Sequence, residues 1–311
     1  MWRWLVLVLT GWVFSVQASE LTMKQPAQWL NAMHAALQQQ NYQGVIVYGM
    51  NNRWDSLAIT HANIDGEEYE RLEILTRKPK ERLRHGAQVT CHHEPTAKPH
   101  SALTNPLAVN IPQPNEEFSY RFSLGKSARI AGRMAQELRI QPQDRERFAM
   151  SLWLDKETAL LLRLDILDDE RNVLERAQYA QISLGKEAPA EAFVSQLPGH
   201  EIAAEAPKSP AKIEWVAWNP SWLPTGFKLT FAAQQAGVVR LMYSDGLAAF
   251  SIFVDDTHGR VPEIERQWGA THAVLAASQT PTKKRITAVG ELPAATLKKI
   301  AHSMLYLEQG E

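Results

Sequence analysis

The chain of 311 residues contains a single cysteine, Cys91. A chain with one thiol forms no disulfide within itself, so its domains must be held together by apolar cores. We expect Cys91 to be buried, the alternative being a thiol available for an intermolecular bond. An excess of charge of one sign is also lacking, because 33 Lys and Arg face 34 Asp and Glu for a net charge of -1. This balance gives no indication of bulk attraction to nucleic acid.

The motifs of common active sites are missing as well. The sequence has no serine elbow, no H-E-x-x-H and no phosphate-binding loop. Cys91, His92 and His93 are consecutive, and neighbours on a strand point to opposite faces, so they lack the spacing of metal ligands. Residues 168–170, D-D-E, have the composition of a solvated turn rather than of paired catalytic carboxylates. We therefore predict no catalytic residue, metal or cofactor; an enzyme built on Cys91 is the weakest alternative.

Residues 1–18 have the composition of a secretory leader. Arg3 precedes an apolar run, and small residues end at a cleavage point after Ala18. The run is shorter than the roughly 20 apolar residues that span a membrane, so we expect cleavage rather than an uncleaved anchor. Ser19 follows Ala18, where a lipoprotein would need a cysteine. The sequence thus predicts an exported, soluble mature protein.

Alternating apolar residues over 146–184 predict a meander of three antiparallel strands separated by polar turns. Residues 25–40 have the apolar spacing of an amphipathic helix, and strand-like runs follow between residues 42 and 93. Residues 94–117 are rich in proline and predict a long functional or mobile loop. The fold class is therefore α+β, mostly antiparallel β. One apolar face of the meander must be covered by another element.

Residues 185–212 are rich in alanine, proline and charge, which is typical of a linker. Beyond them, Asp245 and Gly246 predict a hairpin turn, and a helix is expected from Pro293 to Met304. The predicted division is a signal peptide, a large domain, a linker and a smaller α+β domain, at residues 1–18, 19–196, 197–212 and 213–311.

The apolar face of the large domain is the first candidate site. A half-open sheet closed by one helix can enclose a cavity, and a cavity lined by Leu, Met and Trp suits acyl chains, since each CH2 removed from water is worth about 0.8 kcal/mol. The alternative, a filled core without a cavity, stays open at this point. The residues expected to bind lipid are Trp29, Leu30, Met33, Leu152, Leu154, Leu162 and Leu164.

The second candidate site is an aromatic stretch at the start of the smaller domain. Large aromatic side chains frequently anchor protein interfaces, although these residues can equally build the core of a small domain. The residues expected to bind a partner are Trp218, Trp222, Leu223 and Phe227.

Several segments, taken together and in order, resemble the RseB/MucB family over nearly the whole mature chain. They are Y-Q-G-V-I-V-Y at 42–48, A-G-R-M-A near 131, W-L-D-K-E-T-A-L-L-L-R-L-D at 153–165, V-L-E-R-A-Q-Y at 173–179, W-L-P-T-G-F at 222–227, Y-S-D-G-L-A-A-F-S-I-F-V at 243–254 and V-G-E-L-P at 289–293. The stretch 94–117 does not match the family well.

The resemblance implies a periplasmic protein whose large domain is similar to the lipoprotein carriers LolA and LolB, an unclosed antiparallel barrel around helices. It implies binding to the periplasmic region of a membrane-spanning anti-sigma factor of the RseA/MucA type. That binding shields the anti-sigma factor from the first, site-1 protease cut and keeps the envelope-stress sigma factor inactive. Lipopolysaccharide or another acyl lipid is expected to release the block. Homo-oligomerisation is left open.

The rival interpretation is a periplasmic carrier of lipids or lipoproteins, which would use the same cavity. A carrier has no need of a second domain, so the smaller domain and its W-L-P-T-G-F segment favour the regulator.

Overall fold

The computed structural model describes residues 23–50, 53–93, 105–109, 111–112, 119–195, 197–202, 216–257, 261–278 and 283–307. The predicted leader, its cleavage point after Ala18 and most of the predicted linker lie outside these residues. Within the described ranges, no helix has the length and apolar character needed to cross a membrane.

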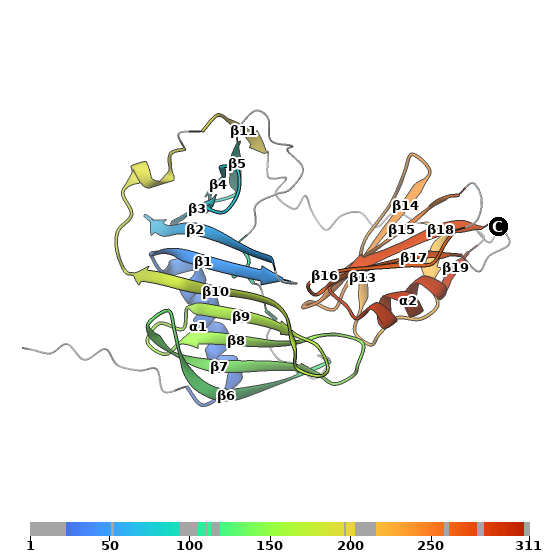
Figure 1. Ribbon diagram of the computed structural model, residues 1–311, viewed down its shortest axis with the longest axis horizontal. Coiled ribbons are helices and arrows are strands. Elements are labelled where there is room, and N and C mark those ends of the chain that lie inside the picture. The colour runs from blue at the N-terminus through green and yellow to red at the C-terminus, as the bar shows by residue number, and fades with distance from the viewer. Residues whose placement is uncertain are drawn as a thin grey trace, which may run out of the picture.

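A single antiparallel sheet of 11 strands forms the larger part of the molecule, in the order β11-β5-β4-β3-β2-β1-β10-β9-β8-β7-β6 (Figure 1). The strands are β1 Tyr42–Met50, β2 Arg53–Ile64, β3 Glu67–Ile74, β4 Lys80–His85, β5 Gln88–His93, β6 Tyr120–Ile130, β7 Arg133–Pro142, β8 Ala149–Asp155, β9 Leu161–Leu167, β10 Val173–Leu184 and β11 Gly199–Ile202. A short 3-10 helix, Ala190–Phe193, follows β10. Strand β6 approaches β10 although three strands separate them in the sheet order, so the sheet is curled. Among the described strands, the two edges β6 and β11 are not paired, so the barrel is unclosed.

Helix α1, Pro26–Gln39, covers the concave side of this sheet. Proline in the first turn suits a helix start, because its missing N–H has no intrahelical acceptor there. The Trp29 indole Nε1–H donates to the Met23 carbonyl at 3.2 Å, which fixes the chain entering the helix. The apolar stripe of α1, which includes Leu30 and Met33, is fully buried against the strands. The helix therefore fills the interior at one side of the curled sheet.

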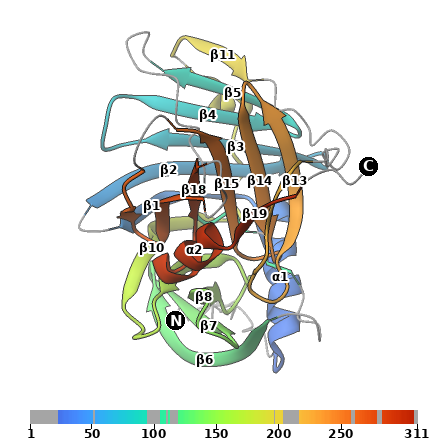
Figure 2. The same ribbon diagram turned by 90° about the vertical axis from the view of Figure 1, so that its right-hand side faces the viewer.

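The second unit follows the predicted linker and has its own core. Its main sheet has six strands in the order β13-β14-β15-β18-β17-β16, with α2 packed on β17 and β18 (Figure 1). Figure 2 views the molecule from the side of this unit. A separate pair, β12 and β19, lies beside it. The elements are β12 Trp218–Pro220, β13 Lys228–Gln235, β14 Val238–Ser244, β15 Ala249–Asp256, β16 Ile264–Trp268, β17 Thr271–Ala277, β18 Lys284–Gly290, α2 Ala294–His302 and β19 Met304–Tyr306.

The predicted fold class is confirmed: the chain is α+β, mostly antiparallel, with an unclosed large sheet and a smaller α+β unit. The predicted helices and the central meander lie within a few residues of their expected bounds. Cys91 is buried, as expected. Strands β11, β12, β13, β16 and β19 were not predicted. Parts of the loop 94–117 lie outside the described residues, but residues 105–109 and 111–112, called the inner segment below, are described.

Candidate functional site at the domain junction

The two units meet through a buried ion pair. Arg147, in the β7–β8 connection, lies 3.1 Å from the Asp245 carboxylate in the β14–β15 turn, and neither side chain is more than 3% exposed. Arg147 Nη2 also donates to the Thr225 carbonyl at 2.5 Å, and its guanidinium lies over the Phe227 ring at 5.1 Å. The Tyr120 hydroxyl donates to Asp245 at 3.0 Å. Arg147 Nε and Nη1 are buried without a hydrogen-bond partner of their own, so the charge of this guanidinium is balanced chiefly by Asp245 and depends on the observed arrangement of the two units.

An apolar contact lies beside the ion pair. Phe148 and Ile166 of the large sheet pack with Ala270 at the tip of the β16–β17 hairpin, and Leu174 flanks them. The Phe148 and His272 rings have centroids 5.8 Å apart. Burial of these apolar groups removes area from water and stabilises the junction.

Glu175 of β10 connects the junction to the concave side of the large sheet. It accepts a hydrogen bond from the Ala270 N–H at 2.8 Å and another from the Tyr48 hydroxyl at 2.6 Å. Gly269 precedes Ala270 with φ +60, and a Cβ atom at that position would lie 2.2 Å from Glu175 Oε1. Glycine is therefore required at the hairpin tip by both the backbone conformation and the approach of the carboxylate.

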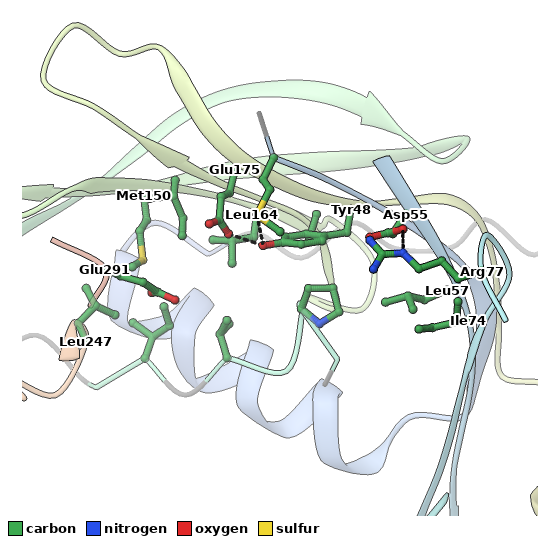
Figure 3. A pocket seen from close by; sticks show the side chains of 16 residues that line it. Tyr48, Asp55, Leu57, Ile74, Arg77, Met150, Leu164, Glu175, Leu247 and Glu291 are labelled. Carbon is green, nitrogen blue, oxygen red and sulfur yellow. Dashed lines mark hydrogen bonds and ion pairs between the residues drawn. The ribbon is translucent and has the colours of Figure 1, made fainter. Parts of the chain in front are cut away.

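A cavity of about 550 Å³ opens at this junction (Figure 3). Its walls come from six strands of the large sheet, from the inner segment and from two loops of the small unit. The lining residues are Tyr48, Met50, Asp55, Leu57, Ile74, Arg77, Pro106, Val109, Ile111, Met150, Leu164, Ile166, Glu175, Ala177, Leu247 and Glu291. A mainly apolar cavity of this size with a few polar groups is typical of a small-molecule site. We call it the junction cavity.

Polar groups lie at both ends of the junction cavity and between them (Figure 3). Asp55 and Arg77 form a two-point ion pair at one end, with Nε to Oδ1 at 2.9 Å, and Glu291 lies at the other end near Glu175 (Figure 3). Glu291 keeps contact with solvent, yet desolvation by the surrounding protein and the Glu175 charge raise its pKa. Desolvation and the hydrogen bond to Glu175 likewise raise the pKa of Tyr48. The hydrogen-bonded pair of Tyr48 and Glu175 lies between the two ends, and most of the other lining side chains are apolar (Figure 3).

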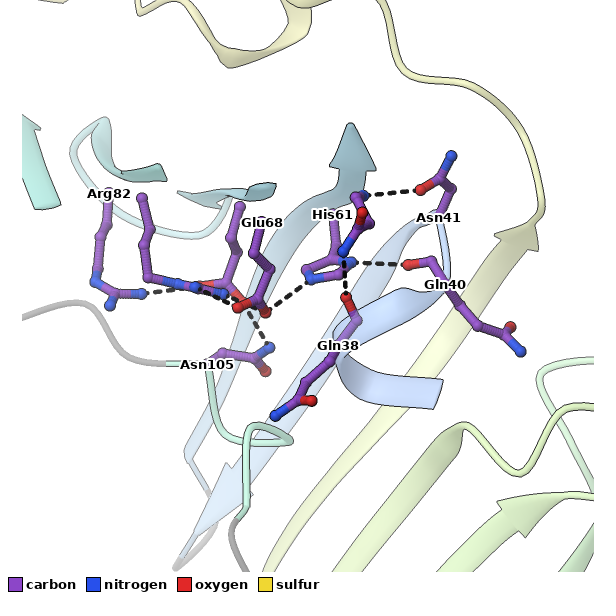
Figure 4. A network of polar contacts seen from close by, with 10 residues as sticks. Gln38, Gln40, Asn41, His61, Glu68, Arg82 and Asn105 are labelled. Carbon is purple, nitrogen blue, oxygen red and sulfur yellow. Dashed lines mark hydrogen bonds and ion pairs between the residues drawn. The ribbon is translucent and has the colours of Figure 1, made fainter. Parts of the chain in front are cut away.

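A second cavity, of about 430 Å³, lies between α1 and strands β3 and β4. It borders a polar network in which His61 contacts the Gln40 carbonyl at 2.8 Å and Glu68 at 3.0 Å, while Glu68 accepts two hydrogen bonds from Arg84 (Figure 4). The Arg84 hydrogen bonds lower the pKa of Glu68 to about 2. The lining residues are His34, Leu37, Gln38, Tyr42, Glu68, Glu70, Arg84, Asn105, Ala108 and Val109. We call it the helix cavity.

Of the seven residues predicted to bind lipid, the junction cavity includes Leu164. The other six pack between α1 and the sheet with exposures of 2% or less and line neither of the two cavities described above: Trp29, Leu30, Met33, Leu152, Leu154 and Leu162. Helix α1, which carries the first three of these residues, packs on the part of the concave face where Leu152, Leu154 and Leu162 lie. Lipid binding by the seven residues stays a prediction.

The four residues predicted to bind a partner lie in or against the core of the small unit. Trp218 and Phe227 are buried, while Trp222 and Leu223 are partly buried against them. Lys299 Nζ lies 3.5 Å from the centre of the Trp222 ring. Phe227 contacts Arg147 of the large unit. The structure therefore divides this set between the small core and the junction, and partner binding by these residues stays a prediction.

The histidines near Cys91 have separate partners. His85 stacks on Tyr69 with ring centroids 4.1 Å apart, and His92 contacts the Leu197 carbonyl at 2.9 Å. Among the described residues, no group of three or more His, Cys, Asp or Glu side chains is placed to hold a metal ion.

Sequence reasoning missed the polar residues of the junction. Tyr48, Glu175, Asp245 and Glu291 each belong to a different one of the segments that carry the family resemblance. Arg147 lies inside the predicted meander, residues 146–184, directly before its first apolar residue, Phe148. The other four residues could have been found from their place inside those segments, because they lie at strand ends and turns rather than among the alternating apolar residues.

Fold and site together define a two-domain binding protein whose ligand-sized cavity is shared by both domains. The MucB/RseB N-terminal domain family matches residues 25–197, and the MucB/RseB C-terminal domain family matches residues 212–305. The chain therefore belongs to the MucB/RseB family.

Individual relatives match almost end to end. The chain is similar to the sigma factor AlgU regulatory protein MucB of Pseudomonas aeruginosa, with 31% identity over 96% of each chain. It is also similar to the sigma-E factor regulatory protein RseB of Escherichia coli K12, with 25% identity over 98% of each chain. A crystal structure of MucB in complex with MucA(peri) superposes with a TM-score of 0.74 and 29% identity, covering 91% of this chain and 100% of that chain. These relatives are named as regulatory proteins.

Proposed function

We propose that this protein is a periplasmic negative regulator of an envelope-stress sigma factor. It binds the periplasmic region of an RseA/MucA-type anti-sigma factor and shields that region from site-1 proteolysis. The observation that carries this proposal is the match of both domains, in one chain, to a MucB structure solved with MucA(peri). A binder that holds the segment a protease must take up protects it by mass action.

The ligand of the proposed switch is the acyl chain of lipopolysaccharide or of another lipid, bound in the junction cavity. Its mainly apolar lining suits a hydrocarbon chain. Because Leu247 and Glu291 come from the small domain and the other lining residues from the large unit, a ligand there contacts both domains. A ligand that favours a different domain arrangement from the one the partner needs weakens partner binding, and the partner weakens ligand binding to the same extent.

The predicted chain organisation belongs to the same proposal. A leader at residues 1–18 exports the chain, residues 19–196 form the lipid-sensing domain, 197–212 the linker and 213–311 the second domain. Trp218, Trp222, Leu223 and Phe227 remain the proposed contact region for the partner. Phe227 of this region contacts Arg147 of the large domain. This contact supports a partner site whose affinity depends on how the two domains are arranged.

The test is a pull-down of purified mature protein with the periplasmic segment of its cognate anti-sigma factor, during titration with lipopolysaccharide. Displacement by the lipid is expected. Ala177→Leu fills the junction cavity and should retain partner binding while losing displacement, whereas Val173→Leu, at an exposed position of the same strand, should behave as wild type. Partner binding without displacement would reject the lipid switch alone.

A lipid or lipoprotein carrier is the second candidate, favoured by the apolar lining of the junction cavity. The same experiment separates the two functions. Acyl-chain binding by a protein that does not retain the anti-sigma segment, at any lipid concentration, would replace the regulator with the carrier.

A further inference from the structure

The inner segment lies between the two cavities. Pro106, Val109 and Ile111 line the junction cavity, whereas Asn105, Ala108 and Val109 line the helix cavity. Val109 is common to both cavities. Strands β1 and β3 also contribute side chains to each of them, so both cavities lie against the same concave wall. The inner segment is therefore the partition between two spaces that would otherwise be continuous along that wall.

Side chains hold the inner segment in place, and no strand pairing contributes. Leu107 and Ile111 are each 1% exposed and pack into the core between α1 and the sheet. The segment's own turn closes through the Leu107 N–H to Asn105 Oδ1 at 2.9 Å and the Ala108 N–H to the Asn105 carbonyl at 3.1 Å. Among the described residues, the hydrogen bond recorded from the inner segment to the rest of the protein is Asn105 Nδ2 to Glu70, at 3.1 Å.

This manner of attachment differs from that of every strand around it. Removing a strand breaks a ladder of backbone hydrogen bonds, each of which leaves buried groups unpaired. Removing the inner segment breaks one side-chain hydrogen bond and exchanges aliphatic contacts. A hydrocarbon chain can take over those contacts, because they are non-directional and need no matching donor or acceptor.

We propose that the inner segment is a displaceable partition, and that an acyl chain long enough to extend from the junction cavity into the helix cavity takes its place. This inference rests on the acyl ligand of the proposed function, and it adds a selectivity for the length of the acyl chain. A short chain fills the junction cavity and leaves the partition in position. A long chain displaces Leu107 and Ile111, joins the two cavities and gains the area of both. The protein therefore distinguishes amphiphiles by chain length.

The experiment measures the affinities of laurate and stearate for the mature full-length protein by calorimetry. Leu107→Ala combined with Ile111→Ala lowers the cost of displacing the partition. Stearate affinity should then rise by at least about tenfold relative to laurate affinity, a ratio that corresponds to about 1.4 kcal/mol. Leu72→Ala is the matched control, because Leu72 is fully buried in the same core and lines neither cavity.

A second variant avoids the risk that the double substitution unfolds the protein. Asn105→Ala removes the hydrogen bond to Glu70 and the one that Asn105 Oδ1 accepts from the Leu107 N–H, and it leaves every aliphatic side chain of the core in place. It should therefore shift the stearate-to-laurate ratio in the same direction by a smaller factor. Equal changes for both fatty acids, or the same shift in Leu72→Ala, would overturn the partition. Wild-type protein that binds neither fatty acid would overturn the acyl ligand itself, a result distinguishable from failure of the partition alone.

Discussion

Replacing Asp245 with asparagine tests whether the buried ion pair holds the two domains in their observed arrangement. Asparagine keeps the oxygen that accepts the Leu247 and Ala248 N–H groups, so the β14–β15 turn is retained. The substitution removes the charge opposite Arg147, whose side chain is fully buried. Removing one partner of a buried pair generally costs about 3–5 kcal/mol. Because Arg147 keeps the Thr225 carbonyl, we expect the lower end, about 3 kcal/mol.

The converse substitution should cost less. Arg147→Met places an unbranched apolar side chain between the Tyr120 and Phe227 rings, which the guanidinium now faces at 5.3 and 5.1 Å. Asp245 keeps its turn N–H donors and the Tyr120 hydroxyl, so about 1–2 kcal/mol is expected from the lost charge-assisted contact. The double variant should lose less unfolding free energy than the two single variants lose in sum, because the two side chains interact with each other in the native protein.

The assay combines urea unfolding, followed by tryptophan fluorescence, with small-angle scattering. Asp245→Asn should lower the unfolding free energy and increase the radius of gyration, because the lost contact joins the domains. An additive double variant with an unchanged radius of gyration would refute the reasoning, since the pair would then be neither coupled nor responsible for the domain arrangement.

Three further substitutions have expected outcomes. Gly269→Ala forces an L-residue into positive φ and against Glu175, so it should cost at least the roughly 1–2 kcal/mol of a left-handed residue; thermal unfolding measures this, and an unchanged midpoint would contradict it. Glu68 has its pKa lowered to about 2 by the Arg84 hydrogen bonds, so its contribution to stability is full above the unfolded-state value of 4.5 and is lost as the pH falls toward 2. Glu68→Gln should flatten that part of the stability-pH profile measured by urea unfolding. Glu291 has a raised pKa, so the folded state binds its proton more strongly, and the associated stability is lost as the pH rises through the raised pKa. Glu291→Gln should abolish this loss, and a profile like that of wild type would contradict the assignment.

Alternation and helical spacing were sufficient for much of the fold because most strands have one buried face. Strand β15 shows this pattern, because Phe250, Ile252 and Val254 are buried while the residues between them are partly exposed. Strand β16, Ile264–Trp268, was missed because it is an edge strand whose residues are mostly exposed, so it carries no apolar alternation. The inner segment was missed for a different reason. Its Leu107 and Ile111 are buried by filling the inside of a curled sheet, which leaves no periodic signal in the sequence.

The site was less accessible to sequence reasoning because its residues come from distant parts of the chain. Tyr48 and Glu175 are 127 residues apart, and Glu291 comes from another domain. Periodicity identifies which face of an element is buried, whereas a cavity is the part of that face that no other element fills. Here α1 fills the part next to Leu152 and leaves the part next to Met150 open. The segments that resemble the family contain Tyr48, Glu175, Asp245 and Glu291, so the resemblance includes side chains at the contact between the two domains. In the function proposed above, the lipid and the partner act on each other through that contact, so the proposal depends on it more than on the identity of any one aliphatic side chain in the cavity.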